Sequence, residues 1–237
     1  MILSIVIPMY NEERTVGDLI ERIQLDLKSL ENRYEIIVVD DCSDDNSLNI
    51  VSKYAHLVKI VSLDVNLGKG NAVRVGIRQA RGTYIIVQDS DLEYDPKDIV
   101  SMLGKAIEKN VKVVYGSRLQ GTQVHLTGIN RIIHKWPNQQ ITSYLFNIVL
   151  SGVYYLFKKV WISDLLTGYK LYERQIFSKW EPKSSGFETD HEITNHLVKM
   201  GYKIIEIPIN YVPRSKSMGK KIGLKDALIA LKVCALD

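Results

Sequence analysis

The chain has 237 residues, of which 46% are hydrophobic and 24% are charged, and its formal net charge is +4. This composition is typical of a folded α/β protein and excludes a disordered or fibrous chain. Two cysteines, Cys42 and Cys234, are too few for a disulfide framework. The small excess of basic residues does not indicate nucleic-acid binding, so we expect no nucleic-acid partner.

The amino terminus and the longest apolar stretch indicate where in the cell the protein is expected. Residues 1–8 lack a basic leader and a cleavage site, which predicts an uncleaved, cytoplasmic chain. Residues 144–162 come closest to a membrane span, but Asn147, Ser151, Gly152, Lys158 and Lys159 interrupt them. We therefore expect this stretch to form an in-plane or buried helix.

Apolar runs and amphipathic runs alternate through the first half of the chain. Strands are predicted at 3–8, 34–39, 57–63, 83–88 and 111–115, and helices at 14–30, 47–56, about 71–80 and from Asp95-Pro96 onward. This alternation predicts an α/β fold with a mostly parallel central sheet flanked by helices. Polar loops should then collect along one edge of the sheet.

The regular alternation stops beyond residue 120. A helix is predicted at 141–159, an extended segment at 168–172, a helix at 188–200, and extended segments at 203–207 and 209–212. No low-complexity tract or linker separates independent domains. We expect one domain over residues 1–213 and a basic, amphipathic C-terminal segment over residues 214–237.

The fourth predicted strand runs directly into acidic residues. Alternation along an extended chain would place Asp89, Asp91 and Glu93 on one side, where their oxygens suit a hard cation, Mg²⁺ or Mn²⁺. Such a cation usually carries a diphosphate. The alternative is a polar loop whose aspartates cap the next helix.

Eight short motifs in order resemble glycosyltransferase family 2, and within it the dolichyl- or polyprenyl-phosphate hexosyltransferases. The motifs occupy residues 6–13, 39–45, 66–72, 88–93, 116–118, 164–170, 186–188 and 206–208. The resemblance implies a GT-A type, nucleotide-sugar-binding fold for the catalytic domain, 1–213. Two positions depart from the family pattern: Cys42 stands where glycine is common, and Thr189-Asp190 follow Glu188 in place of the usual residues.

The resemblance also implies a pocket for a GDP- or UDP-hexose donor. Glycines at 68 and 70 permit close backbone approach, but no Ser or Thr follows Lys69 as in a phosphate-binding P-loop. The alternative role of Asn11 and Asp41 is helix capping. The expected donor-binding residues are Pro8, Tyr10, Asn11, Glu12, Asp40, Asp41, Lys69, Gly70, Asp89 and Ser90.

The acceptor could be a sugar hydroxyl or a lipid phosphate. A hydroxyl needs a base, for which Glu188 or Asp190 is the candidate, whereas a phosphate oxygen is already anionic and needs cations. The run 214–222 resembles an Arg-x-x-x-x-Gly-Lys-Lys-Ile pattern of the lipid-phosphate branch, which favours a lipid. The expected acceptor-phosphate residues are Arg118, Arg131, Arg214, Lys216 and Lys220, against the alternatives of a surface ion pair for Arg118 and a solvated basic tail.

The sequence therefore predicts a metal-dependent, inverting glycosyltransferase that transfers mannose or glucose to a polyprenyl or dolichyl phosphate. Its expected catalytic residues are Asp89, Asp91, Arg118 and Glu188. We expect peripheral attachment at the cytoplasmic face of an anionic membrane, through the basic tail and a helix over residues 224–236. The alternatives are transfer to a saccharide hydroxyl and a non-catalytic nucleotide-sugar-binding protein.

Overall fold

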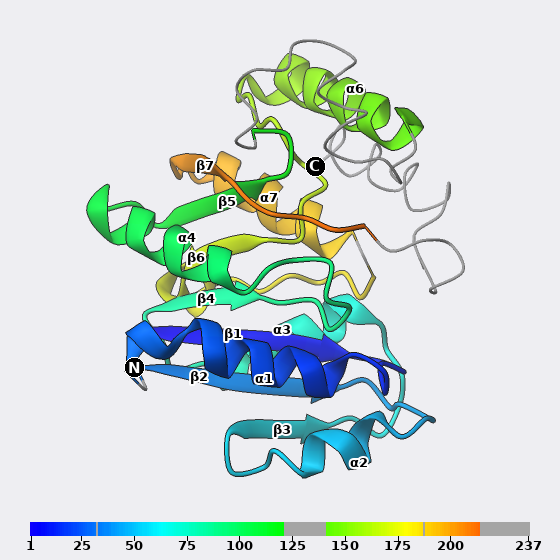
Figure 1. The fold of residues 1–237 in the computed structure, drawn as a ribbon. Coiled ribbons are helices and arrows are strands. Elements are labelled where there is room, and N and C mark those ends of the chain that lie inside the picture. The colour runs from blue at the N-terminus through cyan, green and yellow to red at the C-terminus, as the bar shows by residue number, and fades with distance from the viewer. Residues whose placement is uncertain (32, 121–140, 187, 214–237) are drawn as a thin grey trace.

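The computed structural model describes residues 1–31, 33–120, 141–186 and 188–213. Within these residues the chain forms one sheet with helices on both faces (Figure 1). The strands are β1 (Leu3–Met9), β2 (Tyr34–Asp40), β3 (Val58–Ser62), β4 (Tyr84–Val87), β5 (Val113–Ser117), β6 (Lys170–Glu173) and β7 (Ile204–Pro208). Their order across the sheet is β3-β2-β1-β4-β6-β5-β7.

The helices follow the predicted positions, most of them with shorter bounds, and α3 begins slightly earlier than predicted. They are α1 (Val16–Asp26), α2 (Ser47–Ser52), α3 (Lys69–Gln79), α4 (Lys97–Glu108), α6 (Ile141–Lys158) and α7 (Thr189–Lys199), with 3-10 turns η1 (Lys28–Leu30) and η2 (Arg174–Ser178). The helix predicted at 14–30 was too long, because the chain leaves α-helical geometry at Leu27 and continues as η1. Glu31 then ends the turn in a left-handed conformation, with φ 46.

The sheet is mostly parallel, as predicted, and β6 is the exception. β6 pairs antiparallel with both β4 and β5, whereas β1 with β2, β1 with β4, β2 with β3 and β5 with β7 are parallel pairs. β4 and β5 therefore point the same way on either side of β6. The carboxyl ends of all strands except β6 consequently meet at one edge of the sheet, where open α/β folds place their ligands.

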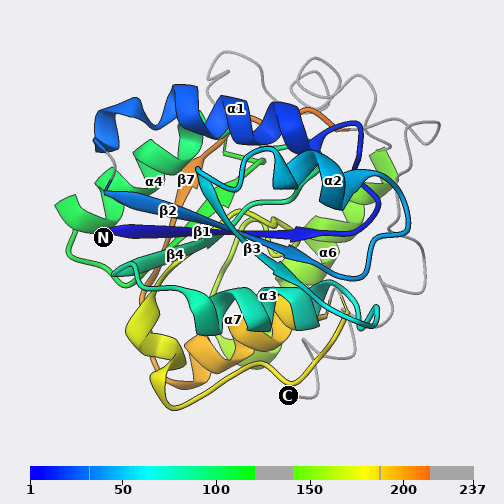
Figure 2. The same cartoon turned by 90° about the horizontal axis from the view of Figure 1, so that it is seen from below.

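Side chains of the buried central strand β1 alternate between two hydrophobic cores. Leu3, Ile5 and Ile7 face the core built with α1 and α4, while Val6 faces the core built with α3, α6 and α7. Figure 2 shows α1 and α4 on one side of the sheet and α3 and α7 on the other. Burial on both faces explains why strands of this sheet read as continuous apolar runs.

A close approach between α3 and β1 fixes the spacing of helix and sheet. Gly76 is buried on α3, and a Cβ atom there would overlap with the side chain of Val6. Gly104 on α4 is exposed, and a Cβ atom there would meet nothing within 4 Å. Gly76 and Gly104 are both inside helices, but only Gly76 lacks room for a side chain.

We expect Gly76→Ala to lower the free energy of unfolding by about 1–3 kcal/mol, since the added methyl group overpacks the core. Gly104→Ala should instead raise it by about 0.5–1 kcal/mol, because alanine favours a helix more than glycine does. Urea unfolding followed by circular dichroism measures both. Equal effects from the two substitutions would contradict the close contact at Gly76.

Candidate active site

The loop after β1 is joined to the loop after β2. The Asn11 backbone N–H donates to Ser43 Oγ (3.0 Å), and Asn11 Oδ1 accepts from the Asp44 N–H (3.0 Å). Asn11 has a left-handed backbone, with φ 54, and the N-cap of α1 is Thr15. Asn11 therefore links two loops and does not cap α1, contrary to the capping alternative.

Three further predicted donor residues line the ends of β1 and β4. Glu12 is buried, and its Oε2 accepts from Thr15 Oγ1 (2.9 Å). Tyr10 is 38% exposed at the rim of the edge. Ser90 Oγ donates to the carbonyl oxygen of Pro8 (3.2 Å), which ties the β4 loop to β1.

Asp40 and Cys42 shape the loop after β2. Asp40 is buried and its carboxylate accepts from Ser43 Oγ (2.5 Å) and Ser62 Oγ (3.4 Å). Cys42 adopts φ 63, a region in which L-residues other than Asn and Asp are uncommon. The residue that departs from the family pattern thus occupies the backbone region that glycine favours.

Asp41 holds the turn that leads into α3. Its carboxylate accepts from the backbone N–H groups of Leu67 (3.0 Å) and Gly68 (2.7 Å). Gly70 N–H donates to the carbonyl of Ser185 (2.7 Å), so this turn also packs on the chain before α7. The N-cap of α2 is Asn46, so Asp41 positions the donor-side turn and does not cap that helix.

Lys69 joins two carboxylates from distant parts of the chain. Its Nζ lies 2.6 Å from Asp89 Oδ1 and 4.0 Å from Asp190 Oδ2. Burial opposes the charge on Lys69, but the two aspartates outweigh it and raise the pKa of the lysine above its ordinary value. A cation thus stands between Asp89, a predicted metal ligand, and Asp190, a candidate base.

The acidic stretch after β4 corrects one expectation from the sequence. β4 ends at Val87, Ser90 and Asp91 lie in a turn, and Leu92 has φ 61. The side-chain alternation assumed for Asp89 and Asp91 therefore does not apply, because the chain between them is not extended. Asp91 Oδ1 accepts from the Glu93 N–H (3.1 Å), which stabilises the turn.

The residue types present fit a hard divalent cation held by Asp89 and Asp91. Glu93 Oε2 accepts from the Tyr211 hydroxyl (2.5 Å), so its carboxylate is engaged elsewhere. Among the described residues no three His, Cys, Asp or Glu side chains gather as a metal-holding group. One or two carboxylates are nevertheless a usual protein contribution to Mg²⁺, with substrate phosphates and water supplying the other oxygens.

Three tyrosines form an aromatic wall beside Asp89. Tyr94 stacks on Tyr169 with ring centroids 4.7 Å apart, and Tyr211 lies 5.1 Å from Tyr94. The Tyr94 hydroxyl accepts from the Gly168 N–H (2.7 Å). A Cβ atom at Gly168 would lie 3.0 Å from Asp89 Oδ2, so glycine there leaves room for the carboxylate.

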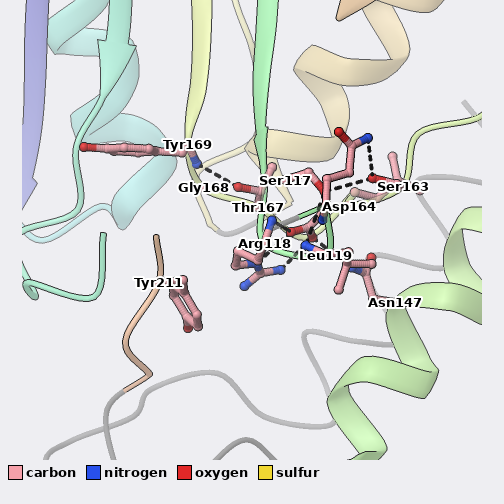
Figure 3. A network of polar contacts seen from close by, with 12 residues as sticks. Ser117, Arg118, Leu119, Asn147, Ser163, Asp164, Thr167, Gly168, Tyr169 and Tyr211 are labelled. Carbon is pink, nitrogen blue, oxygen red and sulfur yellow. Dashed lines mark hydrogen bonds and ion pairs between the residues drawn. The ribbon is translucent and has the colours of Figure 1, made fainter. Parts of the chain in front are cut away.

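Arg118 forms a buried ion pair with Asp164 (Figure 3). The guanidinium donates to Asp164 through Nε (2.8 Å) and Nη2 (2.7 Å), Asn147 Nδ2 donates to the same carboxylate (2.8 Å), and Arg118 lies 5.0 Å from the Tyr211 ring. The two side chains are 11% and 0% exposed, so the surface ion pair considered for Arg118 is not what the structure has.

The ion pair keeps the Asp164 carboxylate charged although it is buried. Burial alone would raise the pKa of Asp164, but Arg118 outweighs it, and the pKa lies below its ordinary value. Glu206 lies next to this pair and accepts from the Ser163 N–H (2.8 Å) and Oγ (2.9 Å). Burial raises the pKa of Glu206 above its ordinary value.

Glu188 and Thr189 lie at the start of α7, where Glu188 is the N-cap residue. Glu188 Oε1 accepts from the Gly186 N–H (3.1 Å), while Thr189 Oγ1 donates to the carbonyls of Gly186 (2.9 Å) and Ser184 (3.1 Å). A Cβ atom at Gly70 would overlap with Thr189. Thr189, the second departure from the family pattern, therefore fastens the turn that packs against α3.

Four predicted site residues fall outside the described residues, and four residues seen at the site were not predicted. Arg131, Arg214, Lys216 and Lys220 fall outside the described residues, as does the predicted segment 214–237. Asp164 and the three tyrosines were not assigned to the site from the sequence. The sequence around Asp164 could have revealed its role, because a lone acid between Ile162 and Leu165 indicates a buried carboxylate that needs a basic partner.

Within the described parts of the chain, no helix combines the length and the apolar content needed to cross a bilayer.

We expect Asp164→Asn to lower the free energy of unfolding by about 3–5 kcal/mol, because it leaves the Arg118 charge buried without its counter-charge. Glu181→Gln, which breaks the exposed Arg78–Glu181 pair, should leave stability unchanged and is the control. Denaturant unfolding at neutral pH measures both. A similar decrease in the free energy of unfolding from the two substitutions would contradict the expectation that the buried ion pair stabilises the fold more than the exposed one.

The same pair predicts the direction of a pH effect. A carboxylate whose pKa is lowered in the folded state stabilises the fold above its unfolded pKa of about 3.9, and this contribution is lost as the pH falls below it. The stability of Asp164→Asn should therefore change less on acidification than that of the wild type.

The chain matches the model of glycosyl transferase family 2 over residues 4–180. It is 40% identical over 120 residues to dodecaprenyl-phosphate galacturonate synthase of Rhizobium johnstonii, a match that covers 49% of this chain and 36% of that protein. It is 40% identical over 111 residues to undecaprenyl-phosphate 4-deoxy-4-formamido-L-arabinose transferase of Shewanella sediminis, covering 45% and 33%. These matches span about a third of the curated relatives' lengths.

Solved structures agree on the fold. Glucosyl-3-phosphoglycerate synthase of Mycobacterium tuberculosis in complex with UDP superimposes with a TM-score of 0.70 at 16% identity, covering 100% of this chain and 81% of that one. The complex of the same enzyme with Mn²⁺, UDP and glucosyl-3-phosphoglycerate gives a TM-score of 0.65 at 17% identity, covering 98% and 77%. The fold is the GT-A type, and the family model shows that the chain belongs to glycosyltransferase family 2.

Proposed function

We propose that this chain is the catalytic part of an inverting glycosyltransferase that transfers a hexose from a GDP- or UDP-sugar to a polyprenyl or dolichyl phosphate. Membership of glycosyltransferase family 2 supports the reaction class. Two relatives are named for polyprenyl-phosphate acceptors and for two different sugars, galacturonate and formamido-arabinose. The lipid acceptor thus has support from relatives, whereas mannose or glucose as the donor sugar rests on the sequence resemblance.

The observation that carries the proposal is the acidic centre at the carboxyl edge of the sheet. Asp89 follows β4 directly, Asp91 stands in the next turn, and the Lys69 ammonium lies 2.6 Å from Asp89. Mg²⁺ or Mn²⁺ held by Asp89 and Asp91 would neutralise the donor diphosphate and stabilise the departing nucleoside diphosphate. Structural neighbours solved with Mn²⁺ and UDP support this assignment.

The proposed reaction is a direct displacement at the anomeric carbon. An oxygen of the acceptor phosphate forms the new bond to that carbon as the bond to the donor's β-phosphate oxygen breaks, and the configuration inverts. The nucleoside diphosphate leaves with the bonding electron pair. Because the attacking oxygen is already anionic, the protein has to position it and needs no general base.

The protein's own residues would then bind and orient the two substrates. The joined loops after β1 and β2 would hold the base and ribose, with Tyr10 at the rim, and the Lys69 ammonium would face the diphosphate. Arg118 is buried against Asp164, so its main effect is to fix the loop after β5 in place. Arg131, Arg214, Lys216 and Lys220 stay predicted ligands of the acceptor phosphate.

We place the protein peripherally at the cytoplasmic face of an anionic membrane, where a polyprenyl phosphate presents its headgroup. This location is supported by the names of the relatives' acceptors and by the basic sequence of residues 214–225.

One observation favours a second function, transfer to a saccharide hydroxyl. Asp190 lies within 4.0 Å of Lys69 and so belongs to the same acidic centre, where a carboxylate could take a proton from a hydroxyl group. Glu188, the other candidate base, precedes it by two residues. Substituting the candidate general bases therefore distinguishes a hydroxyl acceptor from a phosphate acceptor.

We expect Asp89→Ala and Asp91→Ala each to lower kcat/KM for nucleoside diphosphate release by at least about 100-fold, the usual effect of losing a group that stabilises charge in the transition state. The assay supplies Mn²⁺, a polyprenyl phosphate and a panel of GDP- and UDP-sugars. Asp18→Ala, on the exposed surface of α1, is the control and should be fully active.

Full activity of both acidic-centre variants would refute the assignment of Asp89 and Asp91. Metal-dependent binding of a nucleotide sugar by the wild type, with no turnover of any donor, would instead indicate a non-catalytic binding protein.

We expect Glu188→Gln to reduce lipid-phosphate transfer only modestly, about tenfold or less, because an anionic acceptor oxygen needs no base. On the saccharide alternative the same substitution should abolish transfer. Asp190→Asn is measured in parallel with both acceptor types, since it removes the second candidate base. Loss of lipid-phosphate transfer in Glu188→Gln would contradict the proposed acceptor chemistry.

A further inference from the structure

Helix α6 presents apolar side chains to solvent along one face. Sixteen large hydrophobic residues are exposed in the described structure, and seven of them lie between Leu145 and Trp161. Such concentration on one short segment differs from the single exposed apolar residues normal on protein surfaces. We call the following five residues the α6 face: Leu145, Ile148, Val149, Tyr155 and Leu156, which are 40–67% exposed.

The α6 face is a single stripe along the helix. Its members follow the spacing i, i+3, i+4, i+10 and i+11, which lines them up on one side. From Leu145 to Leu156 the stripe extends about 17 Å at 1.5 Å per residue. A stripe of this kind would normally pack against a protein core.

The core-facing side of α6 is a different set of residues. Asn147, Leu150, Ser151 and Tyr154 are buried, and Asn147 donates to Asp164, the partner of Arg118. Helix α6 is therefore anchored to the candidate active site through one side, and the α6 face is not needed for that anchoring. In Figure 1 the helix lies beyond the β5–β7 end of the sheet.

The chemistry around the α6 face suits a lipid surface. No acidic residue occurs between Ile141 and Ile162, whereas Lys158 and Lys159 follow the stripe at its C-terminal end. Tyr155 packs edge-on against the exposed Trp161 with ring centroids 6.2 Å apart. Tyrosine, tryptophan and lysine beside an apolar stripe are typical of helices that lie in a membrane interface.

We propose that the α6 face is the surface with which the protein docks on an anionic lipid bilayer, with α6 lying in the plane of the interface. This inference rests on the proposed lipid-phosphate acceptor, because docking there brings the Arg118–Asp164 side of the site to the level of the headgroups. Apolar burial of the stripe anchors the helix, and the two lysines contact anionic headgroups. The absence of acids along the helix favours this partner over a basic protein surface.

The test measures vesicle binding of matched variants. Leu145→Gln, Val149→Gln and Leu156→Gln are combined in a face variant, and Leu25→Gln, Ile107→Gln and Met200→Gln are combined in a control variant, since these three are 54–61% exposed on other elements. Binding to vesicles of phosphatidylcholine with phosphatidylglycerol is measured by flotation at low salt and in about 1 M NaCl, where the Debye length falls to about 3 Å. Thermal unfolding and UDP binding confirm that both variants are folded.

We expect the face variant to lose at least about tenfold in vesicle binding and the control variant to bind as the wild type does. High salt should remove the contribution of basic residues but leave a difference between the two variants, because apolar burial is not screened. Wild-type protein that does not bind vesicles, or a face variant that binds within twofold of the wild type, overturns the proposal. A face variant that loses only self-association, measured by sedimentation, likewise overturns it.

Nucleoside diphosphate release by the wild type is measured in the same preparations. Loss of vesicle binding by the face variant supports the docking surface even when no donor is turned over, and in that case the proposed reaction fails alone. Turnover together with unchanged vesicle binding refutes the docking surface and leaves the reaction standing.

Discussion

The concentration of carboxylates at one edge of the sheet is the constraint on which the rest of the structure depends. Parallel strands end together, so Asp40, Asp89 and the acids around them are brought close and would repel one another without compensation. Two basic side chains compensate the negative charge: Lys69 stands between Asp89 and Asp190, and Arg118 is paired with Asp164. The acids of the candidate site are therefore held in fixed ion pairs with two basic side chains.

The architecture could be predicted from the sequence because strand and helix periods are local properties. The buried run from Leu3 to Met9 and the alternation that follows it indicated a mostly parallel sheet, which the structure confirms. The direction of β6 could not be predicted in this way. It has four residues, and one of them, Lys170, is a charged side chain that is buried beside the ring of Tyr115. No hydrophobic pattern of that length distinguishes parallel from antiparallel pairing.

The sequence indicated where along the fold the charged residues of the candidate site lie, but not which of them form ion pairs with one another. Motif order placed Asp89 and Arg118 just after strands, which the structure confirms, whereas Lys69 is the first residue of α3. The partner of each charge depends on tertiary packing, as with Arg118 and Asp164, which are 46 positions apart. The alternation assumed for Asp89 and Asp91 failed because β4 ends at Val87 and the chain turns at Ser90 and Asp91, a turn that no apolar pattern marks. The basic residues beyond 213 stay predictions.

The place of β6 in the sheet has a consequence for the order in which the chain can fold. β6 lies between β4 and β5 although it follows both in the sequence, and the two sheet neighbours of β5 are β6 and β7. During synthesis β3, β2, β1 and β4 can pair first, while β5 has no neighbouring strand until residues beyond 170 emerge. A nascent chain therefore exposes β4 as an open edge for more than 80 residues of elongation, the kind of edge at which incomplete chains aggregate.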